Sequence, residues 1–496
     1  MGKAMVERFS MVSKIQIIVL ASAVWLMSLP ARALPQSNDD HKLRDKAAQV
    51  RASVSETSAG EPSVAGVILP ANSAQPVAPA QTPTSFSRFI DPANGLTADD
   101  LVRYALKHNG ELAAARQMIA EVRGRLHQAG LRPNPMVESS YQRGVTSSDN
   151  NLNLMAELPL ELGGRREARV AVAERELEMR QAEVADFERK LAAEVRIKYA
   201  AAIAAARNLK FTEDLLTLTR DSYQIVQARV ERGKSAPLDQ NVVYVELNRV
   251  DAMRINFEGK TEVAMLELKK TVGILPDEPL LLRGEFDVAH QPPPQSDATR
   301  NAMAARPDLT AAHAAENLAL AQIDQARTEG KVDASLFASY MRQDMGFGVR
   351  GINDQGLLAP VQGIFHYVGV GVKLMLPFRN KNQGNIEAAQ ALLEAARSRR
   401  SFAEIVIRNE VAAAYAGFEH ARAALTVYRD GVRNQAQRNL DVIRQTYVLG
   451  QKTLLDFIAE QRRFIEVETS FTDILKAYYE SLIEIDRAAA SPVPSA

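Results

Sequence analysis

Two long stretches of the chain place apolar residues in a seven-residue rhythm between charged ones, and neither contains proline. They cover about residues 164–233 and 381–450, and each ends in a glycine turn. A helix of about 69 residues would be about 100 Å long, so it must find packing partners along its length rather than in one globular core. The pattern predicts long helices packed as in a coiled coil.

The two stretches match one another, which predicts an internal duplication. With a shift of 216 residues, Tyr199 meets Tyr415 and Leu209 meets Leu425. A one-residue slip then aligns the turn glycines Gly233 and Gly450. Each long helix is flanked by shorter helical stretches, and the two shorter helices of the first copy nearly equal the long helix in total length. We therefore expect each copy to form two parallel helical rods of similar length, one a continuous helix and the other made of two shorter helices.

Two stretches of period-two alternation precede each long helix, and these predict four strands with one apolar and one mainly polar face. We expect strands at about Met136–Gly144, Asn151–Leu162, Ala334–Gln343 and His366–Pro377. In the last of these, Val368, Val370 and Val372 share one face. A glycine-rich loop over residues 344–365 is expected between the last two strands.

These elements divide the chain into two repeats, residues 95–273 and 304–488. Residues 1–33 resemble a cleaved signal peptide, because a basic start and a mostly apolar run lead to Ala31-Arg32-Ala33. Residues 34–94 are rich in Ala, Ser, Gln and Pro and are expected to form a disordered linker. Residues 274–303 contain three consecutive prolines and are expected to link the two repeats. Residues 489–496 are expected to form a C-terminal tail.

Composition excludes several function classes. Lys plus Arg equals Asp plus Glu, 60 of each, so no global basic charge favours nucleic acid. The chain has no Cys, which excludes disulfides, thiolate metal sites and a lipidated N-terminal Cys. The seven His residues are scattered without metal-ligand spacing. With no catalytic constellation in view, we expect no enzyme activity, no cofactor and no metal site.

The strands raise a closure problem if they enter a membrane. Four strands are too few for a membrane barrel, which needs about eight, and open edges in lipid would leave backbone groups unpaired. The chain must therefore share a barrel between copies or keep its strands in water. The second possibility corresponds to a soluble periplasmic coiled-coil scaffold.

The chain resembles the TolC-like outer-membrane efflux proteins over about residues 95–488. The resemblance rests on the duplicated layout, on LPLELGGR at Leu158–Arg165, and on the turn motifs RGKSAPLD and LGQKTLLD. It implies a mainly α fold with a transmembrane β part in the cell outer membrane. The expected assembly is a homotrimer with a periplasmic helical tunnel and a shared twelve-stranded barrel, four strands per protomer, which docks a periplasmic adaptor and an inner-membrane pump.

The sequence PLELGGR looks like the subgroup that works with RND pumps of the cobalt–zinc–cadmium type. This resemblance implies export of heavy-metal cations through a passive duct. Efflux of drugs or other organic compounds is the alternative within the same family.

The family's tunnel closes at the two turns, and the resemblance assigns these residues to a pore gate: Asp239, Tyr447, Lys452 and Asp456. We expect a Lys452–Asp239 contact with Tyr447 bonding nearby, and an acidic ring made by Asp456. Lys replaces the family's usual Arg, and Ala459 replaces a second acidic residue, so the latch should be weaker and the ring thinner. The alternative is that both Asp residues only favour helix N-termini.

Small residues at the same turns are candidate adaptor contacts, because they would let another helical hairpin approach: Gly233, Ser235, Gly450 and Thr453. Ordinary turn chemistry explains them equally well. At the other end, an interfacial aromatic girdle is a further hypothesis, formed by Tyr141, Phe337, Tyr340 and Tyr367.

Overall fold

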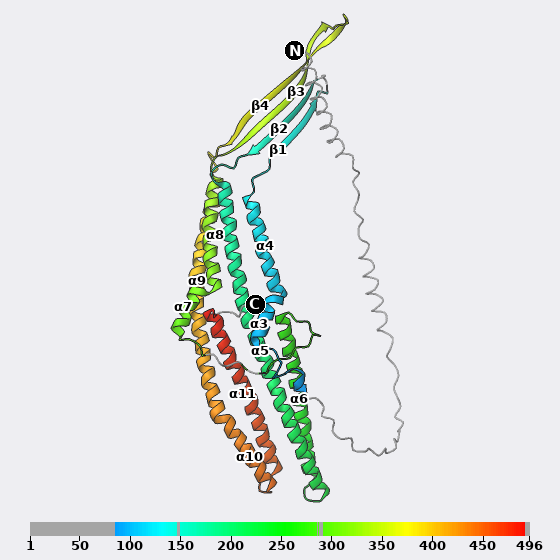
Figure 1. Cartoon of the computed structure of the whole chain (residues 1–496), viewed down its shortest axis with the longest axis vertical. Coiled ribbons are helices and arrows are strands. Elements are labelled where there is room, and N and C mark those ends of the chain that lie inside the picture. Colours follow the sequence, from blue (N-terminus) through cyan, green and yellow to red (C-terminus); the bar gives the residue numbers. More distant parts are fainter. Residues whose placement is uncertain (1–84, 146–148, 285, 287–290, 492–496) are drawn as a thin grey trace, which may run out of the picture. The chain divides into compact units, whose positions relative to one another are not determined.

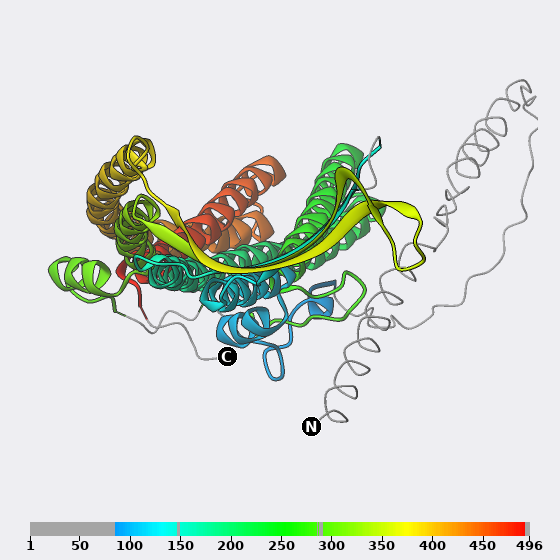
Figure 2. The same ribbon diagram turned by 90° about the horizontal axis from the view of Figure 1, so that it is seen from above.

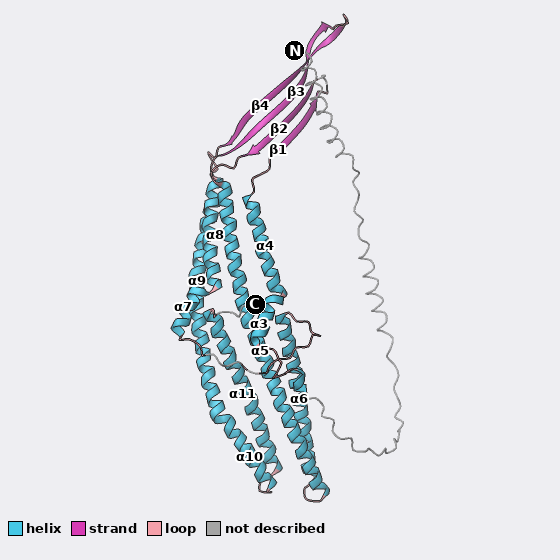
Figure 3. Ribbon diagram, viewed as in Figure 1, coloured by secondary structure: helices cyan, strands magenta, loops and turns pink. Residues whose placement is uncertain are grey.

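The computed structural model describes residues 85–145, 149–284, 286 and 291–491. The expected signal peptide and most of the first linker lie outside these residues. The first repeat consists of α3 (Ala98–His108), α4 (Gly110–Gly130), β1 (Met136–Arg143), β2 (Asn150–Pro159), α5 (Arg165–Glu231) and α6 (Pro237–Val272). Figures 1 and 3 show these elements along the chain.

The second repeat follows the same order with α7 (Gln295–Ala305), α8 (Pro307–Glu329), β3 (Asp333–Ile352), β4 (Leu358–Met375), α9 (Gln383–Val427), η2 (Tyr428–Arg433), α10 (Asn434–Val448) and α11 (Leu454–Ala489). The predicted duplication is therefore visible in the order of the elements. It also extends to individual contacts. Asn109, which caps α4, donates to the carbonyl of Thr271 near the end of α6, and Arg306, which precedes α8, donates to the carbonyl of Ala488 near the end of α11.

The first long helix forms as expected, because α5 is one helix of 67 residues that packs against α4, α6, α8 and α11. The second long run differs from the expectation of one regular helix. A six-residue π-helical segment, η2, separates α9 from α10 around Gly431. Such segments insert a residue into the helical ladder and change the helix direction locally. Among the described residues, no helix combines the length and apolar character needed to cross a membrane.

The four strands form one antiparallel sheet in the order β1-β2-β3-β4. The register gives each strand two faces. We call the face that carries Leu154, Leu158, Val368, Val370 and Val372 the Val–Leu face, and the opposite face the polar face. Figure 2 shows that the sheet is strongly curved. The side chains of Val368 and Val370 are about four-fifths exposed, at 81% and 82%.

The predicted loop over residues 344–365 is wrong. β3 continues to Ile352 and β4 begins at Leu358, so only residues 353–357 turn between them. The alternation continues through Met345 and Phe347 with a glycine between them, and a β-bulge then shifts the register between Phe347 and Arg350. The glycines that suggested a loop instead make room in the sheet: a Cβ on Gly363 would lie 2.9 Å from the ring of Phe365.

Both predicted linkers contain folded segments. Residues Ser85–Arg88 form a 3-10 helix, and Ile90 is buried. Ile90 and Leu96 both bridge to Leu282, which is fully buried and lies inside the expected inter-repeat linker. Ile90 and Leu282 belong to the same buried apolar cluster as residues of α3 and α5, so these segments are part of the core. The same linker also contains most of α7, which ends two residues beyond it, and α11 extends one residue into the expected tail.

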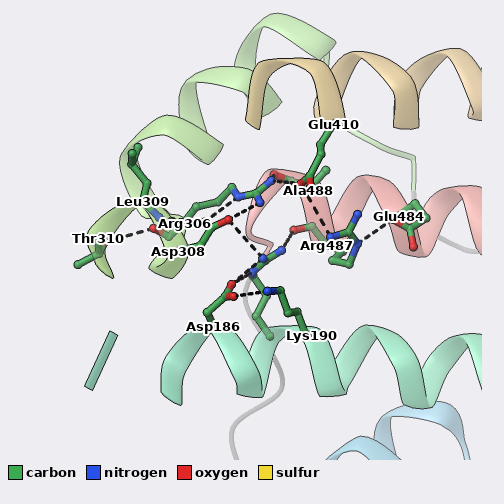
Figure 4. Close-up of polar contacts among 11 residues, drawn as sticks. Asp186, Lys190, Arg306, Asp308, Leu309, Thr310, Glu410, Glu484, Arg487 and Ala488 are labelled. Atoms are coloured by element: carbon green, nitrogen blue, oxygen red, sulfur yellow. Dashed lines mark hydrogen bonds and ion pairs between the residues drawn. The ribbon is translucent and has the colours of Figure 1, made fainter. Parts of the chain in front are cut away.

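A group of charged side chains around the buried Arg306 and Arg189 holds the start of the second repeat to the first (Figure 4). Arg306 is only 2% exposed and pairs with Asp308 at 2.5 Å and with Glu410 of α9 at 2.7 Å. From α5, Arg189 pairs with Asp186 at 2.6 Å and also donates to the carbonyl of Arg487. Four helices thus meet through paired charges.

Candidate functional site

The two predicted turns have the same backbone geometry. Gly233 and Gly450 have φ values of +68° and +77°, in the left-handed region that glycine adopts most easily. Each glycine N–H donates to the carbonyl three residues earlier, and the next N–H, of Lys234 or Gln451, donates to the carbonyl five residues earlier. These paired bonds form the Schellman arrangement that ends a helix. Both glycines are exposed.

The helices after the turns begin differently, although both carry Asp at their third position. Thr453 caps α11 in a capping box: its hydroxyl accepts from the Asp456 amide at 3.2 Å, and the Asp456 carboxylate accepts from the Thr453 amide at 3.1 Å. These bonds hold the pKa of Asp456 below its ordinary value, the backbone bond having the largest effect. The predicted helix-start role of Asp456 is therefore present in the chain.

Asp239 stands at the matching position of α6 but has no capping box, because Ala236 at the N-cap position has no hydroxyl. Its carboxylate has no hydrogen bond or ion pair within the part of the chain that the structure describes. Lys452 is exposed and makes no ion pair there, although its charge helps to lower the pKa of Asp456, so the single chain does not join Lys452 to Asp239. The two groups remain available for partners outside the chain.

Behind the turns, the α5–α6 and α10–α11 hairpins pack on one apolar cluster, formed by Val226, Val243, Ala436, Leu440, Leu454, Phe457, Ile458 and Phe464. Tyr447 is half-buried and stacks on Phe457, with ring centroids 5.8 Å apart and planes 12° apart. Tyr447 therefore supports the second turn through its ring.

Above the turns, buried polar bonds tie α11 to the first hairpin. The Glu246 side chain of α6 is 2% exposed and accepts from Arg249 at 2.7 Å and from Arg462 of α11 at 2.8 Å. Burial alone would raise the pKa of Glu246, but these two arginines lower it below its ordinary value. Gln461 of α11 donates to the Thr219 hydroxyl of α5 at 2.9 Å. The sequence analysis missed these residues, since a lone Glu among many helical charges gives no sign of burial.

The LPLELGGR motif has a structural role where the sheet meets the helices. Glu161, Gly163 and Gly164 have positive φ values, so the chain turns sharply into α5. Arg166 then donates to the Gly130 carbonyl at 2.7 Å, and Arg165 donates to the Glu329 carbonyl at 3.1 Å. Cationic side chains thereby bond the carbonyl ends of α4 and α8, where the helix dipole favours positive charge.

The four candidate girdle aromatics do not share a face. Tyr141 and Tyr340 lie on the Val–Leu face, because they stand opposite Leu152 and Val368. Phe337 and Tyr367 lie on the polar face, opposite Gly371 and Met341. A girdle of all four is therefore wrong, and Phe337 instead covers Gly371, where a Cβ would lie 2.6 Å from its ring.

No group of three or more His, Asp or Glu residues in the described segments is placed to hold a metal ion. The turns, the packed hairpins and the curved sheet give no catalytic arrangement either.

Comparisons with known proteins agree with this description. The family model described as Outer membrane efflux protein matches residues 101–274 and 298–491. The cobalt-zinc-cadmium resistance protein CzcC of Cupriavidus metallidurans is 23% identical over 398 residues, which cover 80% of this chain and 90% of that protein. The nickel-cobalt-cadmium resistance protein NccC of Alcaligenes xylosoxydans xylosoxydans is 39% identical over 80 residues, 16% of this chain and 18% of that protein.

Among solved structures, CusC, which is described as forming a transmembrane channel, superposes with a TM-score of 0.65 at 17% identity. The match covers 84% of this chain and 98% of CusC. This likeness confirms the predicted fold, a mainly helical chain with one four-stranded sheet in a duplicated arrangement.

Proposed function

The chain belongs to the outer membrane efflux protein family, and on that basis we propose that three copies form the duct of a tripartite efflux system. The function class follows from the family: the chain is an efflux channel component of the outer membrane and not an enzyme, as the sequence analysis predicted. The trimer, the particular partners and the cargo go beyond this class and form our proposal.

The sheet supports a shared barrel. Among the residues that the structure describes, β1 and β4 each have one edge without a strand partner, and the Val–Leu face leaves large apolar side chains uncovered. An open strand edge is compatible with lipid only when a neighbouring copy pairs its backbone groups. The exposed apolar face would then be covered by lipid. Three copies would supply twelve strands, with the polar face toward the passage.

At the other end, the two turns are our candidates for docking a periplasmic adaptor that links the duct to an inner-membrane RND pump. Gly233 and Gly450 are exposed and have no side chain, and Ser235 is small, so a partner hairpin could approach the backbone. Thr453 would contribute beside them. We expect Ser235→Arg to abolish co-purification of the adaptor and Ser235→Ala to retain it. Equal recovery with both variants would contradict this contact.

We propose heavy-metal cations as cargo, because CzcC aligns over most of both chains and is named for cobalt, zinc and cadmium resistance. The test is a strain that lacks this gene, with and without the gene restored. We expect several-fold greater sensitivity to zinc, cobalt or cadmium and more retained metal, both reversed by the restored gene. Unchanged metal sensitivity with new sensitivity to organic dyes or drugs would instead support the organic-compound alternative.

The gate proposal is that Lys452 contacts Asp239 in the closed assembly, with Tyr447 nearby and Asp456 in an acidic ring. Its support is that Lys452 and the Asp239 carboxylate are unpaired in the described chain and lie in turns whose hairpins pack together. We expect Lys452→Ala to admit a large hydrophilic antibiotic across the outer membrane, whereas the matched Lys234→Ala in the other turn should not. Equal uptake by both variants would contradict the latch.

We also propose that residues 1–33 are a signal peptide that is removed during export, and that the mature chain has no lipidated Cys, since the sequence contains no Cys. Intact mass of the purified protein tests this. A mass that begins after Ala33 supports cleavage there, and a mass that retains Trp25 contradicts it.

A further inference from the structure

Every methionine in the described strands lies on the polar face of the sheet. They come from all four strands: Met136, Met155, Met341, Met345 and Met375. The pairing fixes their side, because Met155 stands opposite Glu138, Met341 opposite Asn153 and Met375 opposite Asp333.

This placement is unexpected if the methionines serve only as apolar side chains. An apolar role would place them on the Val–Leu face, where Leu and Val stand, but the described strands carry none there. On the polar face their cross-strand neighbours include Asn, Ser, Glu and Asp, together with Tyr367 opposite Met341 and Gly363 opposite Met345. A methionine differs from leucine of similar volume in its polarizable thioether sulfur, so the sulfur is the property that the polar face retains.

Three of these methionines form a diagonal line across β1, β2 and β3, which we call the methionine ladder. Met136 stands two residues before Glu138, the partner of Met155, and Met341 stands two residues after Ser339, the other partner of Met155. Such diagonal neighbours lie about 7 Å apart, within reach of long side chains. Carboxylates alternate with the sulfurs, because Met136 itself stands opposite Glu157.

Thioether sulfur is a soft ligand that selects Cu(I) and related soft ions over harder divalent ions. The chain has no Cys, so methionine supplies its only sulfur ligands. The nearby Glu138 would raise the local concentration of cations, whereas Glu157 is paired with Lys373 at 3.5 Å. We propose that the methionine ladder is a transit site for soft monovalent cations, Cu(I) or Ag(I), which would extend the cargo beyond the divalent ions proposed above. This inference rests on the proposed function in one respect, namely that the polar face lines the passage.

An ion held between two neighbouring methionines of the ladder would have two sulfur ligands and few others, so it would bind weakly. Weak binding suits transit, because an ion must leave as readily as it enters. The ladder also distinguishes two kinds of cargo. Flexible methionines can line a surface for apolar organic compounds, but in that role leucine serves nearly as well. Only a soft ion requires the sulfur.

The test is equilibrium dialysis of the full-length, detergent-purified protein against Ag⁺ in chloride-free buffer, with bound silver measured by mass spectrometry. The ladder variant is M136L/M155L/M341L, in which leucine keeps the apolar volume. The matched control is M118L/M179L/M303L, which changes three helical methionines. We expect at least a tenfold loss of Ag⁺ affinity in the ladder variant alone. Equal binding by the two variants, or no binding by the wild type, would overturn the proposal.

Single-channel recordings of the same samples separate this inference from the proposed function. If the ladder variant forms pores with the same conductance as those of the wild type but has lost Ag⁺ binding, the result would support a site within an intact duct. Ag⁺ binding that depends on the ladder in a protein that forms no pores would support the ion site but contradict the transit role and the duct.

Discussion

The capping box at the second turn allows a sharp prediction about the tip. Thr453→Val keeps the shape of the side chain but removes the hydroxyl that accepts from the Asp456 amide. Loss of an N-cap costs about 1 kcal/mol, which corresponds to about a fivefold rise in the local opening equilibrium. The carboxylate of Asp456 would also lose the hydroxyl bond at 2.9 Å that helps to lower its pKa.

The first turn offers the reverse experiment in the same protein. Ala236→Thr would place a hydroxyl three residues before Asp239, the spacing of a capping box. Hydrogen exchange of peptides from the two turns should then become about fivefold faster at the start of α11 in Thr453→Val and slower at the start of α6 in Ala236→Thr. Unchanged exchange in Thr453→Val, or equal acceleration at both turns, would refute the reasoning.

Three further predictions concern stability. Arg249 and Arg462 lower the pKa of Glu246 in the folded protein, so the ionised Glu246 carboxylate stabilises the fold. This stabilisation should be complete above pH 4.5, the ordinary pKa of Glu, and should be lost as pH falls through the lowered pKa. Thermal unfolding of Glu246→Gln should lack this part of the pH dependence. Arg306→Ala should lower the unfolding free energy by about 3 kcal/mol in denaturant titrations, because two partly buried carboxylates lose their partner. Gly163→Ala should lower the unfolding free energy by about 1–2 kcal/mol in the same assay, since φ is +78°. By contrast, Gly124→Ala in the middle of α4 should raise it by about 1 kcal/mol, because Ala favours a helix more than Gly does.

Most of the fold could be predicted from the periodicity of apolar residues. The seven-residue rhythm located α5 closely, and period-two alternation located all four strands. The extension of β3 and β4 was missed because glycine signals both loops and crowded sheet positions, and only the neighbouring Phe347 and Phe365 rings distinguish the two. The π-helical segment around Gly431 was also missed, since one extra residue in a helical turn leaves no clear mark in the sequence.

The candidate site was less predictable, because contacts between distant segments determine it. Asp239 and Asp456 look equivalent in the sequence, yet a single hydroxyl at Thr453 bonds one carboxylate and leaves the other without a partner in the described chain. Glu246 and Arg462 are far apart in sequence and meet only when the hairpins pack. The faces of aromatic and methionine side chains likewise require the strand register.

The central claim is that copies of this chain form a passive duct through the outer membrane. The most direct test is single-channel conductance of the detergent-purified protein in planar bilayers, with wild type compared with Lys452→Ala/Asp239→Ala. The account predicts small, discrete pores in the wild type that become much larger in the double variant. Pores of unchanged size would retain the duct and contradict the latch. Well-folded trimers that form no pores would contradict the central claim.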